Sequence, residues 1–272
     1  MTTTDKPKPP SPDQLLDSIL DGLTQLRLTI MRQTLLEQLT DPPDGDTRLA
    51  WLWRLIEPQL RHRIESRVER RIRESKMPER KTFDAFDFDF QPELDKDRVL
   101  ELATLRFLDD GRNILLAGMP GTGKSHIALA LALAACVDNQ CVRYTTNADM
   151  LAALHASLAD QTLTHALKAY VRPQLLVIDE VGLEQVESRN AKRAGLMQKV
   201  LLPRYNQRRS TIITSNIPWE AWGDYLDDHL GASALLDRLI HRSHIIVING
   251  PSWRDHEHRR ETESDAQPPA AT

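Results

Sequence analysis

The sequence contains no long apolar run, and this absence limits where the protein can act. Nowhere in its 272 residues does an apolar stretch approach the ~20 residues that a membrane-spanning helix needs. The N-terminus, MTTTDKPKPPSPDQ, is polar and rich in proline, and it has no apolar core of a secretory signal. We therefore expect a cytoplasmic protein that has no membrane as a partner.

Cysteine is also scarce, and the sequence has little that would bind a catalytic metal through histidine or cysteine. The two cysteines, Cys136 and Cys141, have no ligand-like neighbours, which predicts small buried residues in a reducing compartment. The nine histidines show no metal-ligand spacing. A Gly-x-Ser-x-Gly motif and a Cys/His dyad are missing as well, so common hydrolase classes are not indicated.

Excess positive charge is absent from the chain as a whole but present in one segment. The net charge is −4, and residues 1–60 have six basic against nine acidic residues. Residues 61–81, in contrast, have nine basic residues against four glutamates, a net of +5. Such a local excess is informative about anionic partners, although the pI conceals it.

The strongest motif is a glycine-rich segment between an apolar run, 114–116, and an alanine-rich run, 127–136. A strand, a glycine-rich turn and a helix in this order are typical of a phosphate-binding P-loop. Its amides can surround a phosphate, Lys124 can reach the β- and γ-phosphates, and Ser125 can ligate Mg²⁺. The sequence thus predicts ATP and Mg²⁺ as cofactors. The predicted nucleotide-binding residues are Gly118, Met119, Pro120, Gly121, Thr122, Gly123, Lys124, Ser125 and His126.

Downstream of this loop, apolar runs alternate with amphipathic segments, which indicates a parallel sheet with crossover helices. Strands are expected at 113–117, 141–145, 175–179, 211–215 and 245–248. Helices are expected near 124–136, 148–159, 165–170, 191–207 and 234–241, with another at 95–108 before the first strand.

Polar residues at the ends of these strands predict the rest of the site. Asp179 and Glu180 end the third strand, where one carboxylate can hold Mg²⁺ and the other can polarise an attacking water. Asn216 ends the next strand and can orient that water or sense the γ-phosphate. Arg238 lies on a short amphipathic helix and can act on the active site of a neighbouring subunit. Arg254, after the last strand, is a second cationic candidate.

The N-terminal part reads as helical. Leucine spacing predicts one helix from Asp13 to about Leu39, and a second is expected at 47–76 with an apolar stripe. Helical spacing groups four arginines on one face of this second helix, either as a solvated face or as contacts to DNA phosphates. These candidate DNA-binding residues are Arg63, Arg67, Arg70 and Arg71. The alternating Phe-Asp segment 82–92 is expected to be an extended connector, with a phenylalanine beside a nucleotide base as an alternative.

Taken together, these motifs resemble the IstB-like transposition-helper ATPases, relatives of the DnaC-type helicase loaders in the AAA+ group. The matching segments are EQL at 37–39, the F-D-F segment, GRNILLAGMPGTGKSHIA, LLVIDEVG, RRSTIITSN, LLDRL and SWR. The resemblance implies a P-loop AAA+ fold of class α/β. In it, helices flank a five-stranded parallel sheet, no C-terminal lid follows, and an α-helical domain precedes it.

The resemblance also implies roles and partners. Lys124 and Ser125 would belong to Walker A, Asp179 and Glu180 to Walker B, and Asn216 to sensor 1. Arg238 would be an arginine finger acting in trans, and Arg254 a sensor-2-like residue. The expected protein hydrolyses ATP and forms a ring or helical homo-oligomer on double-stranded DNA. Its partner would be a transposase, or alternatively a replicative helicase.

The expected domain limits follow from the same patterns. They are a disordered N-terminus at 1–12, a helical DNA- or partner-binding domain at 13–81, a linker at 82–94, the ATPase at 95–254 and a disordered tail at 255–272. Two other functions stay open: a P-loop kinase for a small molecule, and an adaptor that binds nucleotide but barely hydrolyses it.

Overall fold

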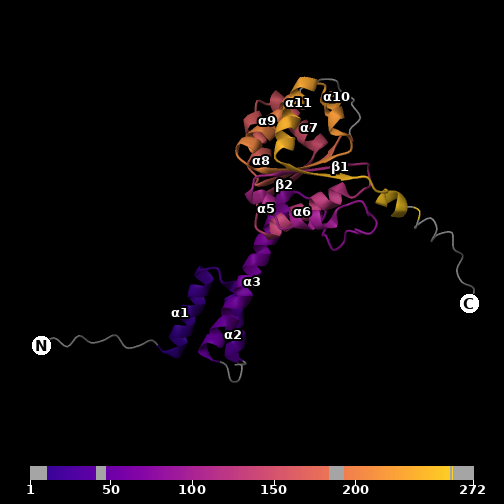
Figure 1. The fold of residues 1–272 in the computed structure, drawn as a ribbon. Helices are drawn as coiled ribbons and strands as arrows, with labels where there is room; N and C mark the ends of the chain where they lie inside the picture. Colours follow the sequence, from indigo (N-terminus) through magenta and orange to yellow (C-terminus); the bar gives the residue numbers. More distant parts are fainter. Residues whose placement is uncertain (1–10, 41–46, 184–192, 258, 260–272) are drawn as a thin grey trace, which may run out of the picture. The chain divides into compact units, whose positions relative to one another are not determined.

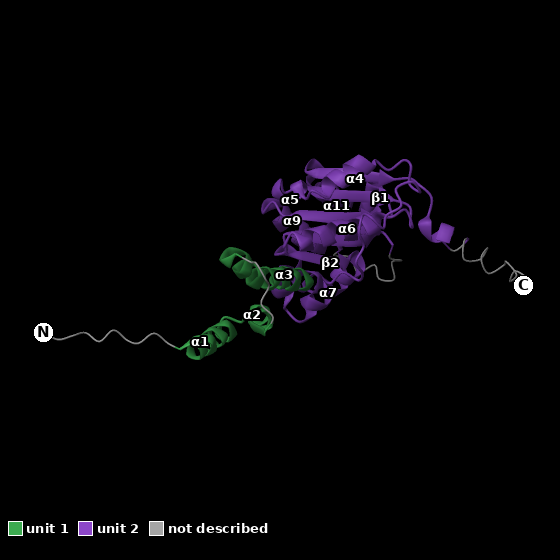
Figure 2. Cartoon of the chain, turned by 90° about the horizontal axis from the view of Figure 1, so that it is seen from below, with its two compact units in different colours: residues 1–69 green, residues 70–272 purple. Residues whose placement is uncertain are grey.

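A computed structural model describes residues 11–40, 47–183, 193–257 and 259. The chain divides into two compact units, Met1–Glu69 and Arg70–Thr272 (Figure 2). The division falls within the long helix α3 (Arg48–Ser75). No helix in the described ranges is both long and apolar enough to cross a bilayer.

The N-terminal unit contains α1 (Pro12–Gln25), α2 (Thr29–Thr40) and most of α3. Ser11 and Gln14 form a capping box that starts α1. The single helix predicted for 13–39 is wrong, because Arg27 adopts a left-handed conformation with φ 56° and ends α1. The leucine spacing continues through this break, so periodicity alone did not reveal it. The small core of the unit is formed by Leu23, Leu35 and Leu55.

Helix α3 confirms the second predicted helix, but its apolar stripe packs only near the C-terminal end, where Ile72 contacts a core of the C-terminal unit. Leu49, Leu52 and Ile64 are exposed at 79%, 43% and 49%. Leu55 and Gln59 on another side are buried. Gln59 Oε1 accepts hydrogen bonds from two backbone amides in the first turn of α2, which have no partners within that helix. A polar residue is therefore part of the packed side.

The C-terminal unit confirms the α/β fold with a parallel five-stranded sheet. Its strand order is β2-β3-β4-β1-β5, and all four pairings are parallel. The strands are β1 (Asn113–Gly118), β2 (Val142–Thr146), β3 (Leu175–Val181), β4 (Ser210–Ser215) and β5 (Ser243–Ile248). Each overlaps a predicted strand.

Helices cover both faces of the sheet (Figure 1). One face packs against α6 (Lys124–Val137), α4 (Lys96–Leu102) and α5 (Arg106–Asp109). The other packs against α7 (Asn147–Ala159), α8 (Leu163–Val171), α9 (Arg193–Asn206), α10 (Trp222–Leu226) and α11 (His229–His241). Ile114 and Leu116 belong to the first core and Leu115 to the second, as the two-residue period of a strand requires. Because both faces of the sheet are buried, the strand sequences are apolar at successive positions and do not alternate with polar residues.

Several local predictions fail for identifiable reasons. The helix expected at 95–108 is two helices, because Leu105 turns left-handed with φ 63°. The 3₁₀ turn Trp219–Ala221 and α10 were not predicted. Of the helix expected at 191–207, positions 191 and 192 lie outside the described residues. Cys141 is exposed, not buried like Cys136.

Residues 82–92 form turns and not an extended connector. The Asp87 carboxylate accepts hydrogen bonds from the amides of Asp89 and Phe90. The Phe86 amide donates to the Phe83 carbonyl at 3.1 Å. Short aspartate side chains compete in this way with extended structure, so alternating Phe and Asp do not produce a strand here.

Candidate active site

The P-loop lies between β1 and α6. Two segments pack against it, one containing Phe86 and the other containing Ser252 and Trp253. Gly123 has φ 97°, and a Cβ there would stand 2.6 Å from Cε2 of Phe86. A Cβ on Gly121 would overlap the Ser252 side chain. The Trp253 amide also donates a hydrogen bond to the Gly121 carbonyl at 2.9 Å. Glycine is therefore required by both backbone conformation and close packing.

Lys124 is almost fully buried, with 4% exposure. Its Nζ donates to the carbonyl oxygens of Gly118 at 2.9 Å and Met119 at 2.8 Å. Burial lowers the pKa of Lys124 to about 8, against an opposing effect of the Asp179 carboxylate. The loop thus holds a partly dehydrated ammonium group among its own carbonyls, and such a group interacts strongly with an anion.

Asp179 on β3 lies at the centre of a hydroxyl network. It is 2% exposed. Its Oδ1 accepts hydrogen bonds from Ser125 Oγ at 2.9 Å and from Thr214 Oγ1. Its Oδ2 accepts from the Tyr144 hydroxyl at 2.7 Å. The sequence indicated Ser125 and Asp179 but not Tyr144 or Thr214, because their proximity depends on strand register.

Glu180 has an unusual backbone conformation for a strand residue. Its φ is 64°, and the register between β3 and β4 shifts between Ile178 and Val181. The Glu180 amide donates to Thr214 Oγ1 at 2.8 Å. Burial, and then the neighbouring Asp179, raise the pKa of Glu180. A bulge and a left-handed residue often occur where a side chain is directed into a site.

Asn216 is fixed directly after β4. Its backbone N–H donates a hydrogen bond to the carbonyl of Val181 at 2.9 Å, so the ends of β3 and β4 stay together beyond the bulge. Ser215 Oγ donates to the Ile217 carbonyl at 2.6 Å and accepts from Nε1 of the fully buried Trp222 at 3.2 Å. The unpredicted helix α10 thus anchors the loop that begins with Asn216.

A pocket of ≈ 490 Å³ brings these groups together. It is lined by the P-loop residues from Pro120 to Ser125, and by His126, Glu180, Asn216 and Arg254. Asp179 lies behind it, within hydrogen-bond distance of Ser125. Lining residues that the sequence did not single out include Glu79 and Lys81, between α3 and α4, and Glu257, in the helical turn 253–257.

The aromatic residues of segment 82–92 also contribute to the pocket. Phe86 and Phe90 line it together with Trp253. The Phe90 and Trp253 rings meet edge-on with centroids 4.9 Å apart. Phe86 contacts the His126 ring in the same manner at 5.2 Å, and His126 Nε2 hydrogen-bonds the Thr82 carbonyl at 2.8 Å. The segment therefore forms one wall of the pocket.

A P-loop, paired carboxylates and a strand-end asparagine therefore occur together on one parallel sheet. The family described as "IstB-like ATP binding protein" matches residues 22–261. The chain belongs to this IstB-like family. The match extends into both units from residue 22 onward, so α2 and α3 also belong to the family pattern.

Two relatives illustrate the likeness of this IstB-like chain to other proteins. It is 35% identical to a protein of Geobacillus stearothermophilus named as an ATP-binding protein of insertion sequence IS5376, over 78% of this chain and 83% of that protein. It is 32% identical to the one named for insertion sequence IS21 in Pseudomonas aeruginosa, over 90% of both chains.

One solved structure with a similar fold confirms the architecture. AMPPCP-bound DnaA from Aquifex aeolicus has a TM-score of 0.52 and 18% identity, covering 69% of this chain and 56% of that chain. The DnaC helicase loader has a TM-score of 0.46 and 23% identity, covering 57% and 90%. The likeness to the DnaA structure shows the expected fold, a five-stranded parallel sheet flanked by helices with a P-loop after β1. Beyond β5, the described residues include a helical turn at 253–257 and no helical lid.

Arg238 lies outside this pocket in the IstB-like chain. It is exposed on α11, and its Nη1 donates to the Ala234 carbonyl at 2.7 Å. Arg254 instead lines the pocket, and its charge affects the pKa of both Lys124 and Glu180. Arg254 thus lines the pocket, whereas Arg238 is exposed outside it.

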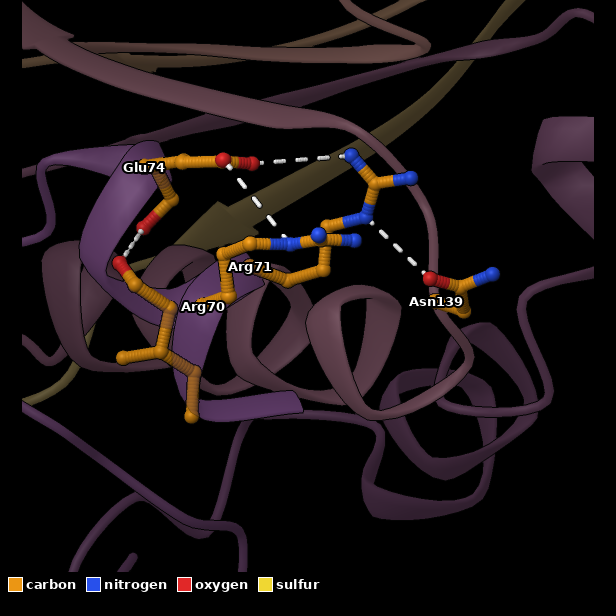
Figure 3. Close-up of polar contacts among 6 residues, drawn as sticks. Arg70, Arg71, Glu74 and Asn139 are labelled. Carbon is orange, nitrogen blue, oxygen red and sulfur yellow. Dashed lines mark hydrogen bonds and ion pairs between the residues drawn. The ribbon is translucent and has the colours of Figure 1, made fainter. Parts of the chain in front are cut away.

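The four arginines predicted for DNA have different surroundings. Arg63, Arg67 and Arg70 are exposed. The Arg71 side chain is only 26% exposed, and its Nε donates to Asn139 Oδ1 at 3.2 Å (Figure 3). Glu74 lies 3.6 Å from Arg71 Nη1 and 3.9 Å from Arg70 Nε. Arg71 is therefore occupied by contacts within the C-terminal unit.

Proposed function

We propose that this protein hydrolyses ATP with Mg²⁺ and uses the bound nucleotide to control its assembly on duplex DNA, as the helper of a transposase. The main support is one pocket that combines Lys124, Ser125, Glu180, Asn216 and Arg254, with Asp179 hydrogen-bonded to Ser125. A phosphate cradle, a metal-binding carboxylate, a base and a cation are the parts that phosphoryl transfer to water requires.

The residues present fit Mg²⁺. The Ser125 hydroxyl and the Asp179 carboxylate are 2.9 Å apart, and hydroxyl and carboxylate oxygens are hard ligands that Mg²⁺ prefers. When bound, the ion would neutralise charge that develops on the phosphate oxygens. Ser125 would hold it directly, and Asp179 would hold it directly or through water.

The remaining residues have separable tasks. When the nucleotide binds, Lys124 donates its hydrogen bonds to phosphate oxygens in place of the two loop carbonyls. Glu180 accepts a proton from the attacking water. The raised pKa of Glu180 makes it a stronger base than an exposed glutamate, because basicity rises with pKa. Asn216 orients the water, and Arg254 stabilises phosphate charge from within the subunit. Phe86, Phe90 and Trp253 offer ring surfaces to the adenine.

Arg238 acts only when subunits assemble into an oligomer. Because it is exposed and does not line its own pocket, it can complete the site of a neighbouring subunit as a trans-acting arginine. Ring or helical oligomers provide such neighbours. Arg63, Arg67 and Arg70 supply exposed positive charge for DNA phosphates. Relatives named as ATP-binding proteins of insertion sequences support a transposase as the partner.

The testing experiment measures particle size and duplex DNA binding with ATP, with ADP and without nucleotide. We expect assembly on DNA with ATP only. Arg238→Ala should abolish ATP-dependent assembly or lower hydrolysis by ~10³-fold, whereas Arg106→Ala, an exposed arginine on α5, should behave as wild type. Glu180→Gln should trap the ATP-bound oligomer.

DNA contacts need a separate measurement. Replacing both Arg63 and Arg67 with alanine should reduce the slope of log affinity against log salt by about 2. Arg32→Ala, an exposed arginine on α2, serves as the control. A monomer that binds DNA equally in all nucleotide states would refute the proposal and favour a nucleotide-binding adaptor.

A further inference from the structure

We infer that Tyr144 is a positioning residue for the magnesium site, because its hydroxyl fixes the carboxylate of Asp179 in the orientation that metal binding requires. This inference rests on the proposed ATPase function, and it adds a residue that neither the motifs nor the comparisons indicate. Tyr144 belongs to β2, a strand without a recognised nucleotide motif.

The two oxygens of Asp179 have different partners. Oδ1 accepts hydrogen bonds from Ser125, Thr214 and the Glu180 amide. Oδ2 accepts from the Tyr144 hydroxyl at 2.7 Å, and this is the hydrogen bond described for that oxygen. With Asp179 2% exposed and Tyr144 9% exposed, water has little access to replace the tyrosine.

Strand register explains why a tyrosine is needed at this position. Tyr144 is paired with Val177, whereas Asp179 is paired with Thr146. The tyrosine side chain therefore spans about two residues along the sheet, roughly 6.6 Å, to reach the carboxylate from the same face. Serine or threonine would be too short, and phenylalanine would fill the space without supplying a donor.

The contact to Oδ2 matters most once a metal ion is bound. The Ser125 hydroxyl would ligate Mg²⁺ through a lone pair and keep its proton for Asp179 Oδ1. Oδ2 takes its described hydrogen bond from Tyr144, so the tyrosine determines how the carboxylate is rotated toward the ion. Groups that orient a metal ligand from outside typically change metal affinity or activity by 10–100-fold when removed.

The alternative is that Tyr144 is a core residue whose hydroxyl merely uses Asp179 as an acceptor. Its ring does belong to the core under α6. The two roles differ in one measurable respect: a core residue affects stability, while a positioning residue affects the gain in nucleotide affinity that Mg²⁺ provides.

The experiment uses the full chain with Tyr144→Phe, which keeps the ring and removes the hydroxyl. Equilibrium binding of a fluorescent non-hydrolysable ATP analogue is measured with saturating Mg²⁺ and with EDTA. We expect the Mg²⁺-dependent gain to fall at least 10-fold and the affinity in EDTA to stay within about twofold of wild type. The Mg²⁺ concentration that half-saturates hydrolysis should rise in parallel.

Tyr170→Phe is the matched control, since Tyr170 is equally buried on the opposite face of the sheet. It should leave the Mg²⁺-dependent gain unchanged. An undiminished gain in Tyr144→Phe, with a normal gain in wild type, would overturn the inference alone. Wild-type protein that shows no Mg²⁺-dependent gain would refute the proposed function itself.

Discussion

Replacement of the buried Arg204 by methionine should destabilise the C-terminal unit more than any exposed arginine substitution. Arg204 lies on α9 and is 1% exposed. Its guanidinium donates to the carbonyls of Tyr170 and Pro173, both at 2.8 Å, and of Ser210, and to Thr211 Oγ1 at 2.9 Å. Burial lowers its pKa to about 9, so the group remains charged at neutral pH.

The magnitude follows from what the substitution leaves behind. Methionine fills much of the volume and removes the buried charge, but the carbonyl oxygens around it lose their donor. Each hydrogen bond to a charged group contributes about 1.5–3 kcal/mol, and breaking a buried charged network typically costs about 3–5 kcal/mol. At about 2–4 °C per kcal/mol for a unit of this size, Tm should fall by roughly 10 °C.

Thermal unfolding followed by circular dichroism measures this change. Arg209→Met is the control, because Arg209 is half-buried and donates one hydrogen bond, to the Val171 carbonyl at 3.2 Å. We expect that control to lower Tm by no more than about 2 °C. If the two variants melt within 2 °C of each other, the buried guanidinium is no more important than an ordinary surface contact, and the reasoning is refuted.

Three further predictions concern the site and the sheet. Lys124 has a pKa of about 8 and binds phosphate in its protonated form, so nucleotide affinity should fall up to tenfold per pH unit above 8; constant affinity to pH 9.5 in a binding titration would contradict this. Burial lowers the pKa of His244 below its value of 6.5 in the unfolded chain, so protonation favours unfolding. Stability should decrease as pH falls from 7 to 5, and His244→Gln should show less of this loss in urea denaturation. A Cβ on Gly182, where φ is 89°, would lie 2.7 Å from Ile217, so alanine should cost about 1–3 kcal/mol. Gly195→Ala, with open space in helix α9, should instead add about 0.5–1 kcal/mol of unfolding free energy.

The parts predicted correctly from sequence are those that local patterns determine. The P-loop brings glycines, a lysine and a serine together within eight consecutive positions. Asp179 and Glu180 lie at the end of an apolar run that is typical of a buried strand. Strand existence was therefore predictable, and the comparisons confirm both the family and the fold.

The parts that failed depend on tertiary neighbours or on single backbone conformations. Tyr144 meets Asp179 only because β2 pairs with β3 in one particular register. Arg27 and Leu105 interrupt apolar periods without a proline or glycine to announce the break. On α3 the stripe from Leu49 to Ile64 is exposed, while Gln59 is buried. Its side-chain oxygen accepts hydrogen bonds from the first turn of a neighbouring helix.

Helix α6 is held at both ends, and this makes it a mechanical link. It begins at Lys124 in the P-loop, and Asn139, two residues beyond its end, binds Arg71. Fourteen residues form a rod about 21 Å long, which is far stiffer along its axis than the turns that flank it. A displacement at the phosphate end would therefore arrive at Arg71 with little attenuation. Asn139 lies outside the pocket. A substitution there would remove the hydrogen bond that connects α6, and through it the P-loop, to the C-terminal end of α3.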